Sequence, residues 1–280
     1  MKQNKTKIAF ICIYSKGGCG VWGRVRQFSE VLIKKNYDIS VLSTNNIKGS
    51  DLKADSFENY KGINIYRFPC FLEFGRNLKF WSFFKKLKQI NPDIIVAEVY
   101  RHPHTLFALN SAKKLKKPVF LTTHAPFVEK SRRSKTGKVL EAFYDKFIGK
   151  KILNKFNEII AITKWEIPFL KKIGLKKKLN FIPNGIPQEF FNNKINLRQP
   201  QKILYFGRIS PVKNLETLIK AMALIKDKNL NTSISADFIG DAEKEYKIKL
   251  DNLIKEKKLN NIIKFSPGVF DIKKKIKIMN

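Results

Sequence analysis

The sequence has few cysteines, few acidic residues and no long hydrophobic run. Its three cysteines, Cys12, Cys19 and Cys70, lack the spacing of a disulfide framework and form no C-x-x-C pair. This argues against disulfide stapling and structural zinc and favours a reducing compartment. No apolar run approaches the roughly 18 to 20 residues of a membrane span. The apolar run at residues 7–14 continues into SKGGCG rather than a small-residue cleavage site, so we interpret it as a first β-strand, not a signal peptide.

Acidic residues are outnumbered, because the 280 residues include 56 Lys and Arg against 23 Asp and Glu, a formal net charge of +33. Such a charge attracts anions, which include nucleic acids, sugar nucleotides and anionic lipids. Most of the basic residues are lysines spread along the whole chain, whereas sites that read phosphate more often use the bidentate arginine fork. The positive charge therefore has two interpretations: it reflects the amino-acid composition of the source proteome, or it was selected as a binding surface. No base-reading module is recognisable, so we expect no nucleic-acid partner.

Short apolar runs alternate with amphipathic segments along the chain, which is typical of βαβ units and a parallel sheet. We expect strands at residues 7–14, 38–44, 62–68, 93–99, 118–124, 158–163, 202–208, 234–240 and 261–265. The predicted fold class is α/β with two Rossmann-like domains. The domains are residues 1–185 and residues 201–280, joined by a linker at 186–200 that lacks clear periodicity.

A glycine-rich loop, Gly17-Gly18-Cys19-Gly20, connects the first predicted strand to a helix. Glycine lets the backbone turn sharply and approach a ligand without an intervening Cβ atom. The helix behind the loop offers free N–H groups to an anion. The spacing is not G-x-G-x-x-G, so a dinucleotide fingerprint is not predicted. A tight turn that binds no ligand is the alternative interpretation.

A second candidate site is the segment FGRISPVKN at residues 206–214. It places Arg208 just after a strand and Lys213 at the start of a helix. Both then lie at the carboxyl edge of a parallel sheet, where α/β proteins bind ligands. Two such cations are able to hold a diphosphate and to stabilise it as a leaving group without a metal ion. The alternative, two more solvated cations in a very basic chain, is favoured by charge alone but not by position.

Histidine is scarce, and His102, His104 and His124 all follow predicted strands at the same sheet edge. An H-x-H pair with a distant histidine is able to ligate a metal, but Glu98 is the one acid near them in sequence and Pro103 constrains the pair. We therefore expect no metal site. His124, which ends PVFLTTH, is the better candidate for a contact with substrate.

Two basic stretches are candidates for contact with a membrane. Residues 68–88, FPCFLEFGRNLKFWSFFKKLK, combine aromatic and basic side chains, and we expect a helix over residues 77–90. Its expected apolar face consists of Phe80, Phe83, Phe84 and Leu87. Packing of this face into the core is favoured over a membrane contact. The loop at residues 130–138, with Arg132 and Arg133, is a candidate for phosphate or headgroup contact, with a solvated loop as the default.

Taken together, these segments resemble the GT-B glycosyltransferases of family 4, a group of retaining enzymes. The matching features are the GG-x-G loop, KPVFLTTH, IPNGIPQEFF, ILYFGRISPVKNLETLIKAM, DFIGDAEKEY and NNIIKFSPGVF, in the family's order. The resemblance implies two Rossmann-like domains facing a cleft, with the acceptor on the first and the sugar nucleotide mainly on the second. It implies metal-independent transfer, without a cofactor, of a sugar from a UDP- or GDP-linked donor to a glycan, lipid or small-molecule acceptor, with retention of anomeric configuration.

The resemblance also implies roles for individual residues. Arg208 and Lys213 match the pair that holds the donor diphosphate, and His124 matches the histidine that contacts the donor sugar near the reaction centre. The other substrate-binding residues that it implies are Gly17, Gly18, Gly20, Asn184, Gly185, Gly240 and Val269. We expect a cytoplasmic enzyme, peripheral on the cytoplasmic face of the membrane, with an anionic membrane surface as a partner.

One departure from the family pattern bears on activity. Family members carry, further on, two glutamates separated by seven residues that grip the donor. The pair with that separation here, Glu158 and Glu166, lies in the first domain and is not that motif. Three strands are readable from Gln201 onward, so we expect the second domain to be incomplete. A truncated or split enzyme, inactive alone or completed by a second chain, is therefore one alternative, and a basic nucleic-acid-binding protein is another.

Overall fold

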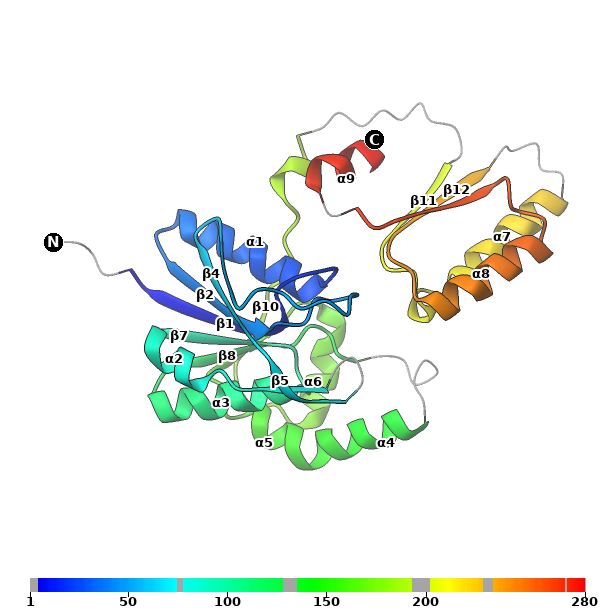
Figure 1. Cartoon of the computed structure of the whole chain (residues 1–280). Coiled ribbons are helices and arrows are strands. Elements are labelled where there is room, and N and C mark those ends of the chain that lie inside the picture. The colour runs from blue at the N-terminus through cyan, green and yellow to red at the C-terminus, as the bar shows by residue number, and fades with distance from the viewer. Residues whose placement is uncertain are drawn as a thin grey trace. The chain divides into compact units, whose positions relative to one another are not determined.

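The computed structural model describes residues 5–74, 78–127, 135–192, 202–228, 234–269 and 271–279 (Figure 1). Within these residues the chain forms parallel sheets covered by helices, which confirms the α/β class expected from the sequence. The chain divides into two compact units, Met1–Gly185 and Ile186–Asn280.

The first unit contains a sheet of eight described strands in the order β10-β9-β8-β7-β1-β2-β4-β3. Neighbouring strands pair in parallel, except that β3 is antiparallel to β4. The strands are β1 (Lys7–Tyr14), β2 (Asp38–Thr44), β3 (Phe57–Tyr60), β4 (Ile63–Phe68), β7 (Ile94–Glu98), β8 (Val119–Thr122), β9 (Glu158–Ala161) and β10 (Leu179–Phe181). The strand order reverses between β1 and β7, and open α/β sheets bind ligands beyond the carboxyl ends of the strands at such a point.

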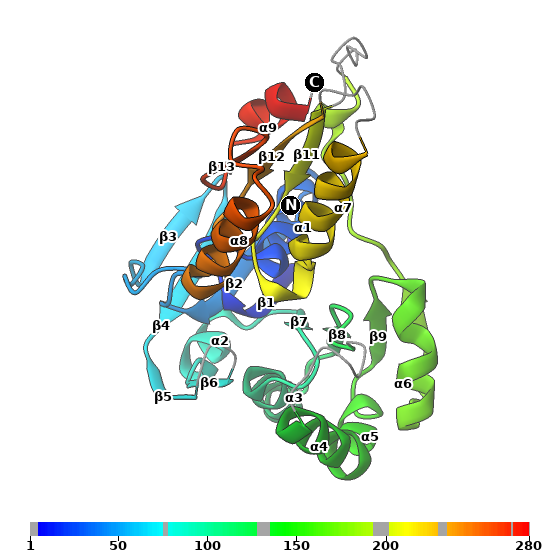
Figure 2. The same cartoon turned by 90° about the vertical axis from the view of Figure 1, so that its right-hand side faces the viewer.

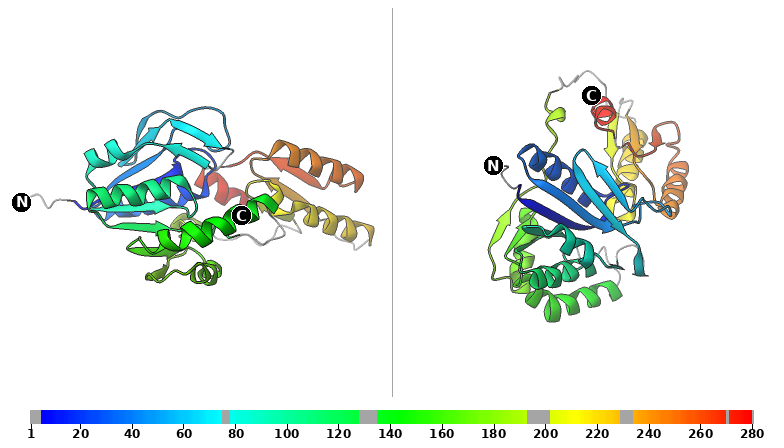
Figure 3. Two further views of the ribbon diagram at one scale, coloured as in Figure 1. Left: turned by 90° about the horizontal axis from the view of Figure 1, so that it is seen from below. Right: turned by 60° about the vertical axis from the view of Figure 1, so that its left-hand side comes forward.

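Helices bury both faces of this sheet (Figure 3). The helices of this unit are α1 (Gly20–Lys34), α2 (Phe84–Ile90), α3 (Pro103–Leu115), α4 (Lys135–Phe143), a π-helical segment (Tyr144–Gly149), α5 (Lys150–Leu153), a 3₁₀ turn (Lys164–Glu166) and α6 (Ile167–Ile173). The residues of β1 alternate between the faces, as a strand requires. Phe10 lies in a core cluster with Val25 of α1, while Ile11 lies in a second cluster with Leu87 of α2 and Ala108 of α3.

The second unit contains three described parallel strands in the order β11-β12-β13 (Figure 2). Its strands are β11 (Lys202–Phe206), β12 (Ser235–Ile239) and β13 (Ile263–Ser266), and its helices are α7 (Leu215–Asp227), α8 (Lys244–Glu256) and α9 (Ile272–Met279). Two 3₁₀ turns lie at Gln188–Phe190 and Pro211–Lys213. Helices α7 and α8 pack against the sheet, with Ile219 and Leu250 fully buried around Phe238 of β12.

The helix expected over residues 77–90 is wrong in its first half. Residues Cys70–Phe74 form β5, which pairs antiparallel with β6 at Leu78–Trp81, and helix α2 begins only at Phe84. The burial of β6 alternates, because Lys79 and Trp81 point inward and Lys79 pairs with Glu73 of β5. A period of two therefore prevails over the helical spacing of the aromatic residues.

The expected core packing of this stretch is confirmed for Phe83 and Leu87, which are buried. Phe80 lies in a strand rather than on a helix. The basic loop with Arg132 and Arg133 lies outside the described residues, as do residues 193–200 of the expected linker. No helix in the described ranges is long and apolar enough to cross a membrane.

Candidate functional site

Glu98, the last residue of β7, gathers three side chains at the carboxyl edge of the first sheet. Its side chain has no exposed surface. One carboxylate oxygen, Oε2, lies 2.5 Å from Nε2 of His124. The other, Oε1, accepts a hydrogen bond from Thr122 at 3.4 Å and lies 3.6 Å from Nη1 of Arg24. The contacts arise from the register of the sheet, because Glu98 and Thr122 face each other across β7 and β8.

Arg24 reaches Glu98 from helix α1, whose start follows the glycine loop. The side chain is 4% exposed, and its guanidinium lies 4.2 Å from the ring centroid of Phe28. Burial lowers the pKa of Arg24, and the nearby Glu98 carboxylate opposes that shift. An arginine stays protonated in proteins, so this is a buried charge pair that joins α1 to the end of β7.

His124 is held by a strained turn. His124 and Ala125 have φ values of 59° and 45°, in the left-handed region that side chains other than glycine rarely adopt. The buried carboxylate of Glu166 accepts hydrogen bonds from the Thr123 hydroxyl at 2.6 Å and from the Ala125 amide at 2.8 Å. It also accepts two backbone amides from the loop after β9. Glu166 therefore fixes the backbone that aims His124 at Glu98.

His104 stabilises the backbone of Glu98 at the same carboxyl edge of the sheet. Its Nε2 donates a hydrogen bond of 2.6 Å to the backbone carbonyl of Glu98. Burial lowers the pKa of His104 to about 3, so the ring is neutral, with its proton on Nε2. The neighbouring Val99 has a φ of 78°, and its carbonyl accepts the Thr105 hydroxyl at 2.6 Å. Within the described ranges no group of three His, Cys, Asp or Glu residues is arranged to hold a metal ion, and His102 and His104 do not converge with His124.

The glycine loop lies at the end of β1, next to β7 in the sheet. Gly17 has a φ of 83°, and a Cβ atom on it would lie 2.3 Å from the carbonyl oxygen of Lys48. The Gly18 amide donates to the same carbonyl at 3.3 Å. Gly20 is the first residue of α1, and a Cβ atom there would meet open space. The loop therefore needs a glycine at position 17 for its own packing, whereas position 20 leaves room in front of the helix.

We expect Gly17→Ala to lower the free energy of unfolding by about 1–3 kcal/mol, because the residue is strained and its Cβ atom meets backbone that has to shift. Urea denaturation of the full chain measures this change. Gly20→Ala is the matched control and should have little effect, since alanine suits a helix and nothing lies near its Cβ atom. Equal effects of the two substitutions would contradict this account of the loop.

Asn184 and Gly185 lie in the extended segment after β10, at the end of the first unit. Both are exposed, and a Cβ atom on Gly185 would meet no other atom within 4 Å. The structure does not bring them into contact with His124 or the glycine loop. Their expected role in substrate binding stays a prediction.

In the second unit the ends of the three strands are joined by close backbone contacts. A Cβ atom on Gly240, after β12, would lie 1.8 Å from the carbonyl oxygen of Gly207, after β11. Glycine is therefore required at position 240 for this approach. Asp241 accepts the amide of Gly268 at 3.2 Å and so ties the loop after β13, with the half-buried Val269, to the same edge.

Arg208 and Lys213 flank this edge and are exposed. Arg208 follows Gly207, and its backbone carbonyl accepts the hydroxyl of Tyr205 at 2.7 Å. Lys213 ends the 3₁₀ turn that precedes α7. In the part of the chain that the structure describes, neither cation pairs with a carboxylate. Ser210, between them, is buried, and its hydroxyl lacks a hydrogen-bond partner within the same residues.

The start of helix α7 is partly occupied by other groups. The amide of Leu215 donates to the hydroxyl of Tyr246 at 3.0 Å, and Glu216 in the first turn pairs with Lys249 at 2.9 Å. The positive end of the helix dipole is therefore already compensated by a carboxylate. An anion at this edge would depend on the side chains of Arg208 and Lys213 more than on the helix.

The structure assembles two partial sites, one in each unit. Arg24, Glu166 and Asp241, which help to build these sites, were not predicted from the sequence. The pairing of Glu98 with other side chains was not predicted either. Two signals could have pointed to Glu98, a single acid at the end of an apolar strand and its position before the H-x-H segment. The partners of Glu166 lie up to 43 residues away, so no local pattern indicates its role.

Comparisons with known proteins agree with this architecture. A family model described as Glycosyltransferase Family 4 matches residues 19–190, and one described as Glycosyl transferases group 1 matches residues 187–279. An uncharacterized glycosyltransferase of Methanocaldococcus jannaschii is 28% identical over 293 residues, which cover 93% of this chain and 68% of that protein.

The capsular polysaccharide biosynthesis glycosyltransferase CapH of Staphylococcus aureus is 24% identical over 247 residues, with 83% of this chain and 62% of CapH covered. The chain thus spans about two thirds of the length of these relatives. Among solved structures, Anabaena HepE in complex with UDP and glucose superposes with a TM-score of 0.68 at 18% identity, covering 95% of this chain and 70% of HepE. At that identity the likeness concerns the fold.

Proposed function

The chain belongs to glycosyltransferase family 4, and we propose that it transfers a sugar from a nucleotide-diphosphate donor to an acceptor hydroxyl, with retention of anomeric configuration and without a metal ion. In this reaction the bond between the anomeric carbon and the diphosphate oxygen breaks. The acceptor oxygen bonds to the anomeric carbon, and its proton passes to the departing diphosphate or to solvent. The leaving group departs with additional negative charge, so groups that stabilise that charge lower the barrier.

The observation that carries the proposal is the position of Arg208 and Lys213. Both are exposed at the carboxyl edge of the second sheet, and neither pairs with a carboxylate among the described residues. Two free cations five positions apart on one loop suit the two phosphates of a nucleoside diphosphate. The contact between Gly240 and Gly207 keeps the loop close to the strand ends, which supports a backbone approach to the same phosphates.

In this proposal His124 contacts the donor sugar. Its Nε2 is engaged by Glu98, and the ring nitrogen Nδ1 is then the atom that would face a sugar hydroxyl. Glu98 and Glu166 act as positioning residues, because they hold the ring and its backbone and do not themselves reach substrate. The glycine loop at Gly17 supplies backbone near the same edge.

UDP is the first nucleotide to test, since the HepE structures contain UDP and UDP-glucose. GDP is the alternative. A glycan, a lipid-linked sugar and a small molecule are the candidate acceptor classes, and the related protein CapH acts in capsular polysaccharide biosynthesis. The proposal also includes a second chain that contributes to the second unit. If this chain alone turned over a sugar nucleotide, no second chain would be needed.

Titration of UDP and GDP into the full chain by calorimetry tests the donor site. Lys213→Met should weaken binding of the preferred nucleotide about tenfold to a hundredfold, because it removes a charge-assisted contact to phosphate. Lys220→Met, which removes another exposed lysine, from α7, is the matched control and should leave binding unchanged. If neither nucleotide bound while RNA bound with a steep salt dependence, the nucleic-acid alternative would replace this proposal.

A further inference from the structure

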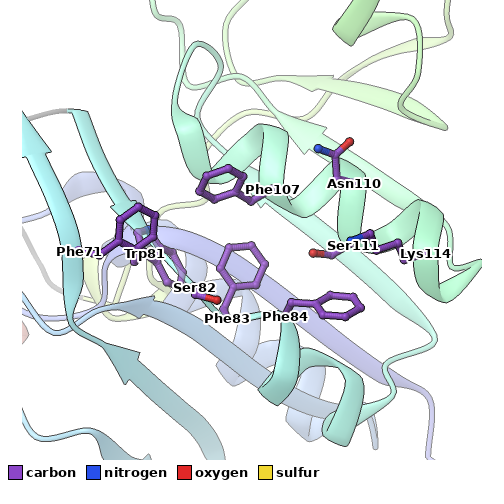
Figure 4. A pocket seen from close by; sticks show the side chains of 9 residues that line it. All are labelled: Phe71, Trp81, Ser82, Phe83, Phe84, Phe107, Asn110, Ser111 and Lys114. Atoms are coloured by element: carbon purple, nitrogen blue, oxygen red, sulfur yellow. The ribbon is translucent and has the colours of Figure 1, made fainter.

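A pocket of about 310 Å³ lies in the first unit between the β5–β6 hairpin and helices α2 and α3 (Figure 4). Its walls are aromatic, and a few polar groups stand at one side. The lining residues are Phe71, Trp81, Ser82, Phe83, Phe84, Phe107, Asn110, Ser111 and Lys114. Trp81 and Phe83 are buried, so the floor of the pocket offers rings and no charge. Apolar walls with a small polar rim are the usual composition of a ligand site.

The polar side of the pocket lies away from the carboxyl edge described above, whereas the ring centroid of Trp81 on its floor lies 6.3 Å from that of His104. Helix α3 starts at Pro103, close to Glu98 in sequence, and three of the polar lining residues, Asn110, Ser111 and Lys114, lie in its second half. At 1.5 Å per residue, Lys114 is about 16 Å along the helix from Pro103. A group bound at Lys114 is therefore at the other end of α3 from Glu98 and His104.

The charge on the two helices beside the pocket is of one sign. Helix α2 contains three lysines and no acid, and helix α3 contains two lysines and no acid. Lys114 is exposed at the rim, where its ammonium lies 5.3 Å from the ring centroid of Phe84. Because no lining residue is a carboxylate, Lys114 is available to an anion that rests above the aromatic floor.

The hairpin extends the apolar surface away from the pocket. Phe71 and Phe74 are 67% and 57% exposed, and Leu72 and Leu78 beside them are also exposed. Contiguous exposed apolar side chains next to a pocket mark a binding surface more often than chance solvent exposure. An occupant that continues out of the pocket over these side chains must itself be apolar, while the lysines favour a negative charge at its end.

We propose that this pocket binds one acyl chain of an anionic phospholipid in a bilayer, with the phosphate on Lys114 and the hairpin side chains at the lipid surface. A carbohydrate fits less well, because the exposed apolar side chains of the hairpin that continue from the pocket, such as Phe71 and Phe74, would gain no apolar partner from it. The proposal gives the first unit a specific lipid-binding role in addition to the proposed sugar transfer. Its test uses no sugar nucleotide, so its outcome does not depend on the proposed donor site.

Trp81 provides a direct readout of the pocket. The chain contains Trp22, Trp81 and Trp165, and the double substitution Trp22→Phe, Trp165→Phe leaves Trp81 alone. We expect vesicles of phosphatidylcholine and phosphatidylglycerol with brominated chains on the phosphatidylglycerol to quench its fluorescence. Vesicles of brominated phosphatidylcholine alone should not. Bound vesicles without quenching of Trp81 would overturn the proposal.

Paired variants test whether the vesicles bind at the pocket or are attracted to the positive charge of the whole protein. Lys114→Glu should weaken binding to the mixed vesicles at least about fivefold, whereas Lys220→Glu, with the same charge change in the second unit, should not. Asn110→Phe should abolish quenching by filling the pocket without changing charge. Phe71→Ser should weaken binding, and Phe191→Ser, at a similarly exposed site, is its control. Equal effects of Lys114→Glu and Lys220→Glu, or relief of quenching by a soluble oligosaccharide, would contradict a lipid pocket.

Discussion

Arg208→Ala is expected to lower the rate of UDP release from UDP-glucose about 10²–10³-fold, which is the usual effect of removing one group that stabilises charge in the transition state. Arg208 is exposed at the strand edge and has no carboxylate partner among the described residues, so its charge is available to a ligand. The charge on the departing diphosphate increases as its bond to the sugar breaks. The loss should therefore fall mainly on kcat rather than on KM.

Hydrolysis of the donor in the absence of an acceptor measures this effect without knowledge of the acceptor. Arg208→Lys is the conservative variant, and it should recover only part of the rate because an ammonium lacks the bidentate fork. Circular dichroism should show the fold unchanged, since the side chain is on the surface. A variant Arg208→Ala with an unchanged kcat would remove Arg208 from the proposed reaction. If GDP-glucose is the preferred donor, the same comparison applies to GDP release.

Glu98→Gln is expected to destabilise the first unit by about 3–5 kcal/mol, the typical loss when one partner of a buried ion pair is removed. The substitution leaves the guanidinium of Arg24, 4% exposed, without its counter-charge. It also replaces the carboxylate that engages His124. Urea denaturation monitored by tryptophan fluorescence reports the change in the free energy of unfolding.

A double variant distinguishes the charge pair from mere loss of packing. Arg24→Met combined with Glu98→Gln removes both charges and should recover most of the stability that Glu98→Gln loses. Glu30→Gln is the surface control, because Glu30 lies 3.8 to 3.9 Å from Lys61 and Arg26 in solvent and should change stability by less than about 1 kcal/mol. Similar values for Glu98→Gln and Glu30→Gln would show that the buried pair contributes little.

The α/β class, the GT-B fold and the family could be predicted from the sequence, because continuous apolar runs mark buried parallel strands and the loops at their ends carry recognisable residues. Arg208 follows a strand and Lys213 precedes a helix, and a local pattern is enough to place both at a sheet edge. The pairing of Glu98 with His124 could not be predicted, since it depends on the register between β7 and β8.

The β5–β6 hairpin is a second feature that could not be predicted from the sequence. Its aromatic residues fit a helical period, but Lys79 and Trp81 are buried at alternate positions of β6, and Lys79 pairs with Glu73 on the neighbouring strand. The spacing of hydrophobic residues does not indicate that a lysine is buried. The pocket beside this hairpin therefore could not be predicted from the sequence.

The sheet order of the first unit also governs how the chain folds. β1 is the central strand, seven of its eight residues are buried, and one of its two neighbours is β7, to which Lys7 is joined through Asp93, 86 residues later. Pairing over such a distance is slow because a long loop has to close first. During synthesis β1 leaves the ribosome well before β7, as an apolar segment without its partner. The lysines at its start, Lys5 and Lys7, are placed where gatekeeper residues oppose aggregation until the sheet closes.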